Sequence, residues 1–275
     1  MDSFSGKTAV VTGAASGIGR ALVDKCLAEG MNVVLADVEH EALNRTLEEL
    51  NHAGSRVIGV QTDVARAEEL DRLAEATLRA FGAVHLLFNN AGVGAGSTAW
   101  ESSLADWTWV IGVNLWGVIH GIRSFVPIML AQNEPGYIVN TASIAGLVKG
   151  HHSASYATTK HAVVALSEQL AVEFGRTGAM LKVAVLCPSW VNTRINESGR
   201  NRPPDLQNPA PAAPPSPEAL KRWAELQAAT EQATPASVMA DFTFAGLRAG
   251  KLYLLPHPES HAWVQRRFDG IAEDF

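Results

Sequence analysis

The sequence predicts an α/β protein with a doubly wound parallel sheet, and three observations support this prediction. Short apolar runs rich in branched residues, the pattern of buried parallel strands, recur from the N-terminus onward. Helix-length segments separate these runs, which favours a parallel sheet covered by helices on both faces. A glycine-rich turn joins the first run to the first helical segment.

Seven runs are predicted strands, and helical patterns lie between and after them. The strands are TAVV at 8–11, NVVLA at 32–36, RVIGV at 56–60, HLLF at 85–88, YIVN at 137–140, LKVAVL at 181–186 and KLYLLP at 251–256. The helices are expected at about 17–29, 39–52, 66–81, 104–131, 153–176, 218–232, 235–249 and within PESHAWVQRRFDGI at 258–271.

The segment PPDLQNPAPAAPPSP, from Pro203 to Pro217, interrupts this pattern and holds seven of the thirteen prolines. Proline-rich chain of this kind forms a semi-rigid spacer. Because helical and strand patterns resume after it, we expect an insertion, residues 194–234, within a single domain spanning 1–275.

Composition excludes several classes of protein. The net charge of −6 and the pI of about 5.8 give no clustered basic face for nucleic acid. No apolar run approaches the roughly 18 residues of a membrane span, and MDSFSGKTAVVTG lacks the features of a signal peptide. The two cysteines, Cys26 and Cys187, lie in a helical and a strand pattern, which favours buried thiols and a cytoplasmic location.

The turn TGAASGIG follows the first strand and carries Gly13, Gly17 and Gly19, with Ser16 and Ile18 between them. Glycines let the backbone approach a pyrophosphate, and the N–H groups that begin the next helix bind the anion. The strand before and the helix after are the context in which this pattern indicates a dinucleotide site.

Acids after the second and third strands extend this site. Asp37 lies where a carboxylate accepts hydrogen bonds from the adenosine ribose hydroxyls. Helix capping is the alternative for Asp37, and it is nearly as good an interpretation of Asp63, which with Val64 would bind the adenine. No base follows Asp37, since the next residue is Val38, and the nearest base, Arg20, is expected to point away. The carboxylate would therefore repel the phosphate that NADP carries on its adenosine ribose. The predicted cofactor is NAD.

Further motifs follow the later strands in order. NNAG occupies 89–92, Asn114 lies in the long helix, NTAS ends at Ser143, and YATTK runs from Tyr156 to Lys160. With the glycine turn, these motifs resemble the short-chain dehydrogenase/reductase family over about residues 5–195. The resemblance implies a Rossmann-type fold and cofactor contacts at Asn90, Gly92, Tyr156, Lys160, Pro188, Val191 and Thr193.

Tyr156 and Lys160 share one helix face because they are four residues apart. We expect Lys160, together with the positive nicotinamide, to lower the tyrosine pKa from about 10 toward about 7. The resemblance implies that Tyr156 is the acid and base, Ser143 orients the substrate oxygen, Lys160 also holds the nicotinamide ribose, and Asn114 anchors a proton-relaying water. It implies an oxidoreductase that interconverts a secondary alcohol and a ketone by hydride transfer.

Loops after the fourth, fifth and sixth strands should surround the substrate. They indicate a bulky hydrophobic or aromatic substrate, because their candidate residues are mostly apolar: Trp100, Leu147, Val148, His151, His152 and Trp190. Solvated histidines and a packing role for Trp190 are the alternatives. Residues 194–234 are expected to close over the substrate as a lid. No arginine pair in these loops suggests a carboxylate or phosphate clamp, and no metal is expected.

The resemblance also implies a homo-oligomer, expected to be a tetramer, and the apolar outer positions of the helices at 104–131 and 153–176 agree with it. One departure is Ser189 after Pro188, where the family commonly has glycine, since serine adopts positive φ less readily. A non-catalytic NAD-binding redox sensor is the alternative function, but such a protein is expected to lose catalytic groups, and all four are present.

Overall fold

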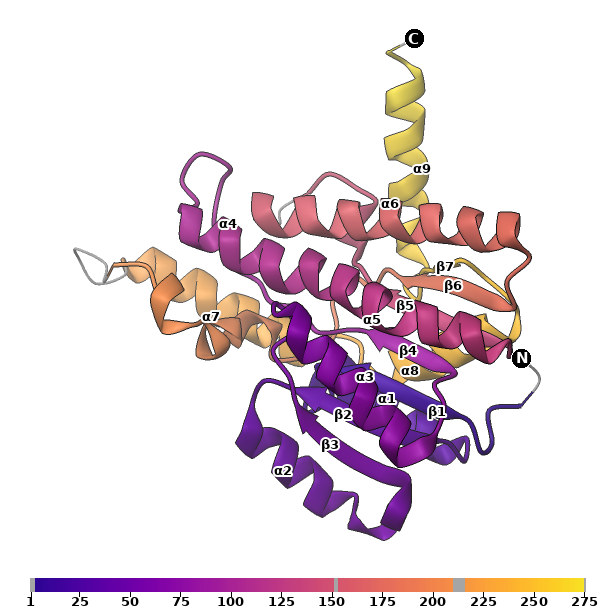
Figure 1. The fold of residues 1–275 in the computed structure, drawn as a ribbon. Coiled ribbons are helices and arrows are strands. Elements are labelled where there is room, and N and C mark those ends of the chain that lie inside the picture. Colours follow the sequence, from indigo (N-terminus) through magenta and orange to yellow (C-terminus); the bar gives the residue numbers. More distant parts are fainter. Residues whose placement is uncertain (1–2, 151–152, 210–215, 275) are drawn as a thin grey trace.

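The computed structural model describes residues 3–150, 153–209 and 216–274, and within these ranges seven strands form one sheet (Figure 1). Its order is β3-β2-β1-β4-β5-β6-β7, and every pairing is parallel. The predicted doubly wound sheet is therefore confirmed. The strands are β1 Thr8–Thr12, β2 Asn32–Asp37, β3 Val57–Gln61, β4 Leu86–Asn89, β5 Gly136–Thr141, β6 Leu181–Leu186 and β7 Tyr253–Leu254.

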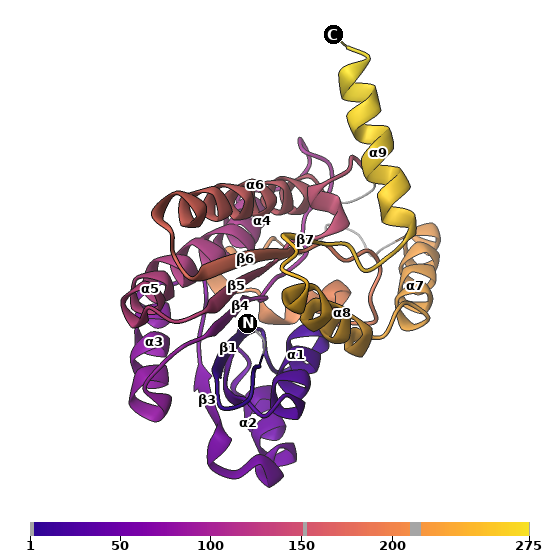
Figure 2. The ribbon, with the colours of Figure 1, turned by 90° about the vertical axis from the view of Figure 1, so that its right-hand side faces the viewer.

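Helices cover both faces of the sheet (Figure 2). One face carries α1 (Gly17–Ala28), α2 (His40–Glu49) and α8 (Ala236–Arg248), whose apolar side chains form one core cluster with the strands. The other face carries α3 (Ala67–Phe81), α5 (Gly117–Gln132) and α6 (Ala154–Thr177), which form a second cluster. Branched strand residues alternate between the two clusters, so both faces are buried and the sheet is a rigid base for a site at its edge.

The helix predicted at 104–131 is interrupted. It consists of α4 (Leu104–Ile111), a π-helical turn (Gly112–Trp116) and α5. By length and composition alone, Leu104–Gln132 could cross a membrane, although 44% of its most apolar window is buried in the protein. Its contacts with α3, α6 and strands β4 and β5 identify it as a helix packed on the sheet.

The remaining helices are α7 (Pro217–Glu231), within the insertion, and α9 (Glu259–Ala272), whose second half projects beyond the body of the molecule (Figures 1 and 2). The two ends of the insertion are joined. Val191 forms an isolated parallel bridge with Thr234, and the Asn192 N–H donates to the Thr234 carbonyl at 2.9 Å. The insertion therefore starts and ends at one place, beside the carboxyl end of β6.

Candidate active site

The carboxyl ends of the strands open onto a cavity of about 1700 Å³. The cavity is lined by fifteen of the seventeen residues that the sequence predicted for the site. Asn114 and Gly19 are the exceptions, and both lie directly behind the lining. The motifs that are scattered over 180 residues of sequence are thus brought to one edge of the sheet, as parallel strands require.

The glycine turn is tightly packed against its surroundings. A Cβ atom on Gly19 would lie 1.9 Å from the Gly13 carbonyl oxygen, and one on Gly17 would lie 3.0 Å from the Thr193 methyl. Gly17 also has a φ of +53°, which other residues rarely adopt. Only glycine fits both positions, and the N-terminus of α1 consequently faces the cavity, where it can bind a pyrophosphate.

Asp37 ends β2 and is 8% exposed. Its carboxylate accepts hydrogen bonds from the Ala15 N–H at 2.9 Å and the Glu39 N–H at 3.0 Å, which fix it beside the glycine turn. Burial raises its pKa, and these two hydrogen bonds work against that shift. Residue Glu39, and not Asp37, occupies the capping position of α2.

One contact at this end was not expected from the sequence. Arg200 and Asn201, from the start of the insertion, donate to the Glu39 carboxylate at 2.9 and 3.0 Å. Arg200 thus lines this end of the cavity, whereas Arg20 pairs with Asp24 on its own helix and with Glu49. The insertion thus contacts Glu39, two residues after Asp37 at the end of β2.

Asp63 and Asn90 both have structural partners as well as positions in the cavity lining. The Asp63 carboxylate accepts from the Ala65 N–H at 3.0 Å, but Arg66 occupies the capping position of α3, so Asp63 is not the helix cap that the alternative interpretation proposed. The Asn90 amide donates to the Thr12 carbonyl at 2.9 Å, which joins the ends of β1 and β4.

The catalytic candidates Ser143, Tyr156 and Lys160 lie together where β5 ends and α6 begins. The Lys160 ammonium donates to the Thr141 carbonyl at 2.8 Å and lies 5.5 Å from the centroid of the Tyr156 ring. Ser143 forms a hydrogen bond with Tyr156 and is itself 6% exposed. The backbone of the Ser143 turn is fixed by the Pro188 carbonyl, which accepts from the Ile144 N–H at 2.8 Å.

Burial dominates the ionisation of this group. It raises the pKa of Tyr156, although the hydrogen bond with Ser143 works against the shift, and it lowers the pKa of Lys160 to about 8. The expectation that Lys160 lowers the tyrosine pKa is therefore wrong for the protein groups alone. Desolvation disfavours the charged form of each group, the phenolate of Tyr156 and the ammonium of Lys160.

Asn114 lies in the π-helical turn and is fully buried. Its amide forms a pair of hydrogen bonds with the Val93 backbone, accepting from the N–H at 2.8 Å and donating to the carbonyl at 2.9 Å. Its second N–H donates to the Thr159 hydroxyl at 3.3 Å. Asn114 thus holds the chain that follows NNAG against α6, one residue from Lys160.

The loop after β6 resolves the question raised by Ser189. Among the described residues, Asn133 is the one non-glycine residue with positive φ, so Ser189 has ordinary backbone geometry. The Ser189 N–H donates to His257 at 3.1 Å, and the other ring nitrogen of His257 lies 3.2 Å from the Trp190 carbonyl. A buried histidine near the C-terminus therefore supports this loop.

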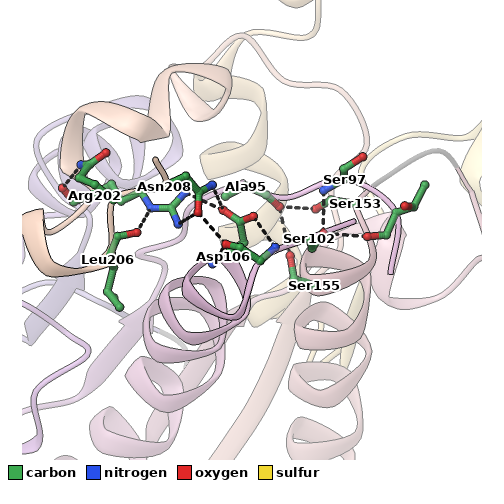
Figure 3. A network of polar contacts seen from close by, with 12 residues as sticks. Ala95, Ser97, Ser102, Asp106, Ser153, Ser155, Arg202, Leu206 and Asn208 are labelled. Atoms are coloured by element: carbon green, nitrogen blue, oxygen red, sulfur yellow. Dashed lines mark hydrogen bonds and ion pairs between the residues drawn. The ribbon is translucent and has the colours of Figure 1, made fainter. Parts of the chain in front are cut away.

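A buried ion pair joins Arg202, which lines the cavity, to Asp106 of α4. Arg202 donates to the Asp106 carboxylate at 2.6 Å and lies 5.2 Å from the centroid of the Trp109 ring (Figure 3). Asn208 donates to the same carboxylate at 3.0 Å. Burial opposes ionisation of Asp106, but its hydrogen bonds, first that from Arg202, outweigh burial and lower its pKa. Residues 202–208 are thereby attached to the start of α4.

The loop after β4 is attached to α6 on the other side of this network (Figure 3). The hydroxyls of Ser153 and Ser155 donate to the Ala95 carbonyl at 2.6 and 3.1 Å. These serines flank the N-terminal turn of α6, next to Tyr156. The apolar wall made by Val93 and Trp109 is therefore held at a fixed place relative to Tyr156.

The structure places the predicted substrate-wall residues differently from one another. Val148 and Trp190 line the cavity, whereas Leu147 is buried in the core. Trp100 is 83% exposed and borders a separate hollow, so its prediction was wrong. His151 and His152 lie outside the described residues. Sequence reasoning missed Trp109, Leu206 and Trp263, which belong to helical or proline-rich patterns that carry no signal of the site.

Comparisons with known proteins agree with this geometry. A family model described as short chain dehydrogenase matches residues 7–203. A short-chain dehydrogenase/reductase from Burkholderia phymatum, solved in complex with NAD, is 46% identical, with a TM-score of 0.93 and coverage of 100% of this chain and 97% of that chain. The CLA biosynthesis dehydrogenase/reductase of Lactiplantibacillus plantarum is 30% identical over 100% of this chain and 96% of its own. The 3beta-hydroxysteroid dehydrogenase 1 of Eggerthella lenta is 37% identical over 71% of this chain and 74% of its own.

Proposed function

We propose, on the premise that this chain belongs to the short-chain dehydrogenase family of oxidoreductases and uses NAD as its cofactor, that it interconverts a secondary alcohol and a ketone. The observation that carries the proposal is the placement of Tyr156 beside Ser143 and Lys160, at the edge of the sheet where the NAD-binding residues meet. The similarity to a hydroxysteroid dehydrogenase supports a secondary alcohol as the substrate.

The residues of this chain fit NAD along the length of the cavity. Asp37 would bind the adenosine ribose, and the N-terminus of α1 at Gly17 would bind the pyrophosphate. Lys160 would hold the nicotinamide ribose. NAD, when bound, accepts the two electrons and the hydrogen that leave the carbinol carbon.

Side chains of the protein would transfer the proton of the substrate hydroxyl. In the oxidation direction, the Tyr156 phenolate takes the proton of the substrate hydroxyl, and in reduction the phenol returns it. The Ser143 hydroxyl orients the same substrate oxygen, since it is already hydrogen-bonded to Tyr156. Burial opposes the Tyr156 phenolate, and the charges of Lys160 and of the bound nicotinamide together would offset this opposition. Asn114 fixes the backbone behind Lys160, and a relay through a water at this place stays part of the proposal.

The substrate is proposed to be bulky and hydrophobic. The wall that faces Ser143 is made of Val93, Trp109 and Val113, with Leu206 from the insertion. Trp190 and Trp263 extend this apolar surface on the other side. Such a wall stabilises an aliphatic or aromatic ring system by burial and offers few polar partners to a small hydrophilic alcohol.

Three further proposals concern the protein as a whole. We propose a single domain spanning 1–275, in which 194–234 covers the substrate. We propose a homo-oligomer, because apolar side chains are half exposed on the outer faces of α5 and α6 and in the π turn: Trp116, Leu130 and Val172. We propose a cytoplasmic location, which is compatible with the free buried thiols of Cys26 and Cys187.

A panel of secondary alcohols and ketones, read by NADH absorbance, tests the proposal. Tyr156→Phe should lower kcat by at least about 100-fold, because the positioned acid–base group is lost. The affinity for NADH, measured by fluorescence, should change little. Thr158→Ser, two residues along α6 and outside the cavity lining, is the matched control. Turnover of no alcohol and no ketone, with normal NADH binding, would instead favour the redox sensor.

A further inference from the structure

The middle of α9, from Trp263 to Arg267, lines the cavity before the end of this helix projects beyond the body of the molecule. Arg266 and Arg267 line the cavity there, together with Lys149 from the loop after β5. One turn earlier on α9, Trp263 packs against the apolar cluster that contains Leu147. Three cations from two distant parts of the sequence therefore lie beside the same edge of the sheet. The loops alone contain no arginine pair, so the sequence did not predict this group.

Arg267 is held in place by the loop that carries Ser143. One Nη1 N–H of Arg267 donates to the Leu147 carbonyl at 2.8 Å, and Leu147 is four residues beyond Ser143. The side chain is neither buried nor fully exposed. A guanidinium has five N–H donors, so this single bond orients the group and leaves the rest of its fork available to a ligand.

These cations have no carboxylate partner. Among the described residues, no Asp or Glu lies within ion-pair distance of Arg266, Arg267 or Lys149. Every other arginine that lines the cavity is paired with a carboxylate: Arg45, Arg194, Arg200 and Arg202. The chain as a whole has a net charge of −6, so positive charge left unpaired at the substrate end stands out from its surroundings.

We propose that the substrate carries an anionic oxyacid group, a carboxylate or a phosphate, away from its carbinol carbon, and that Arg267 binds this group with Arg266 and Lys149 beside it. The inference rests on the proposed function and narrows its substrate class to hydrophobic alcohols with an acidic end. An apolar wall near Ser143 and a cationic mouth match the two ends of such a molecule. The planar fork of arginine suits the paired oxygens of carboxylates and phosphates.

The test uses one hydrophobic secondary alcohol in four forms: the neutral parent, a derivative with a remote carboxylate, the methyl ester of that derivative, and a phosphate analogue. The native enzyme should show a kcat/KM for the carboxylate or the phosphate at least about tenfold above that of the ester. Arg267→Gln should lower kcat/KM for the preferred anionic substrate by about 10- to 100-fold. The same substitution should change kcat/KM for the neutral parent by less than about threefold. Whichever anion is preferred identifies the oxyacid.

Arg123→Gln is the matched control, because Arg123 is an exposed arginine on α5, outside the cavity lining, and its loss removes the same charge. It should leave all four substrates unaffected. Activity of Arg267→Gln on the neutral parent shows that the variant is folded.

The possible failures are distinguishable. Equal efficiency for acid and ester in the native enzyme, or an equal effect of Arg267→Gln on both, would overturn the inference while the alcohol dehydrogenase activity stands. If no form is turned over, the proposed function fails. Calorimetric binding of the acid to the NADH-loaded protein then decides the inference separately, since an affinity unaffected by Arg267→Gln would overturn it.

Discussion

We expect the selectivity between NAD and NADP to depend on Asp37, and replacing one cofactor by the other is the perturbation. NADP carries a phosphate on the adenosine ribose hydroxyl that Asp37 is placed to bind. The carboxylate is 8% exposed, and its hydrogen bonds to the Ala15 and Glu39 N–H groups hold it in position. It therefore cannot turn away from the phosphate.

The magnitude follows from the charges at this end of the cavity. Two like charges about 4 Å apart repel by about 4 kcal/mol at an effective dielectric constant of 20. Arg200 offsets part of this repulsion, since it favours the charged form of Asp37, but its hydrogen bonds go to Glu39 and to the carbonyls of Arg194 and Glu197. We therefore expect a preference for NAD of at least about 100-fold in kcat/KM, which corresponds to about 2.7 kcal/mol at 1.36 kcal/mol per tenfold change.

The assay compares kcat/KM for the two cofactors with the best alcohol of the panel, and it compares the affinities for NADH and NADPH by fluorescence. Asp37→Ser combined with Val38→Arg should narrow or invert the preference, because Val38 is 40% exposed and lines the cavity. Asp63→Asn is the control, since it removes another cavity carboxylate and should affect both cofactors alike. Comparable efficiency of the native enzyme with NAD and NADP would refute the reasoning about Asp37.

Three further measurements test the ionisation, the ion pair and the assembly. Burial lowers the pKa of Lys160 from 10.5 to about 8. Between pH 8 and pH 10.5 the amine is therefore neutral in the folded chain and charged in the unfolded chain, so unfolding takes up a proton. From pH 8 to pH 10.5, the unfolding free energy of the native chain should thus rise by up to about 3 kcal/mol relative to Lys160→Met, and denaturant titrations with parallel pH profiles would contradict this. Arg202→Met should lower the unfolding free energy by about 3 kcal/mol because it leaves the buried Asp106 carboxylate without its cation, whereas Arg200→Met, at a more exposed pair, should cost less; equal losses would oppose the argument. Light scattering should give about four times 29.3 kDa, and the mass of one chain at micromolar concentration would exclude the oligomer.

The sheet and the candidate active site could be predicted from the sequence because their signals are local. Each strand shows its own apolar run, and Asp37 ends a strand while Ser143 closely follows one, so parallel pairing brings them to one edge. Tyr156 lies in the first turn of α6, and the helical spacing to Lys160 is its local signal. The bounds of most helices agree with the predicted ones within a few residues.

The remaining wall of the cavity depends on contacts between distant residues. Arg202 binds Asp106 over a separation of 96 residues, and Arg267 binds the Leu147 carbonyl over 120 residues. The residues next to Arg202 and Arg267 in the sequence do not distinguish them from arginines that are exposed to solvent. Trp100 shows the converse error, since an apolar side chain in a loop near the site suggested a contact but is exposed to solvent. The pKa of Tyr156 was misjudged because the degree of burial, which sets it, depends on the packing of the whole edge.

The π-helical turn at Gly112–Trp116 has a consequence for how this chain tolerates insertions and deletions. A π turn holds one residue more than an α-helical turn, and each residue rotates a helix by about 100°. Deleting Val113 would restore a regular helix and turn the faces of α4 and α5 relative to each other by that angle. Either Asn114 would leave Val93, or α5 would present its outer residues to the sheet. The extra residue therefore sets the rotation of α4, which contributes to the cavity wall, relative to α5, which packs in the core. The length of this segment should consequently vary less than the identity of its residues.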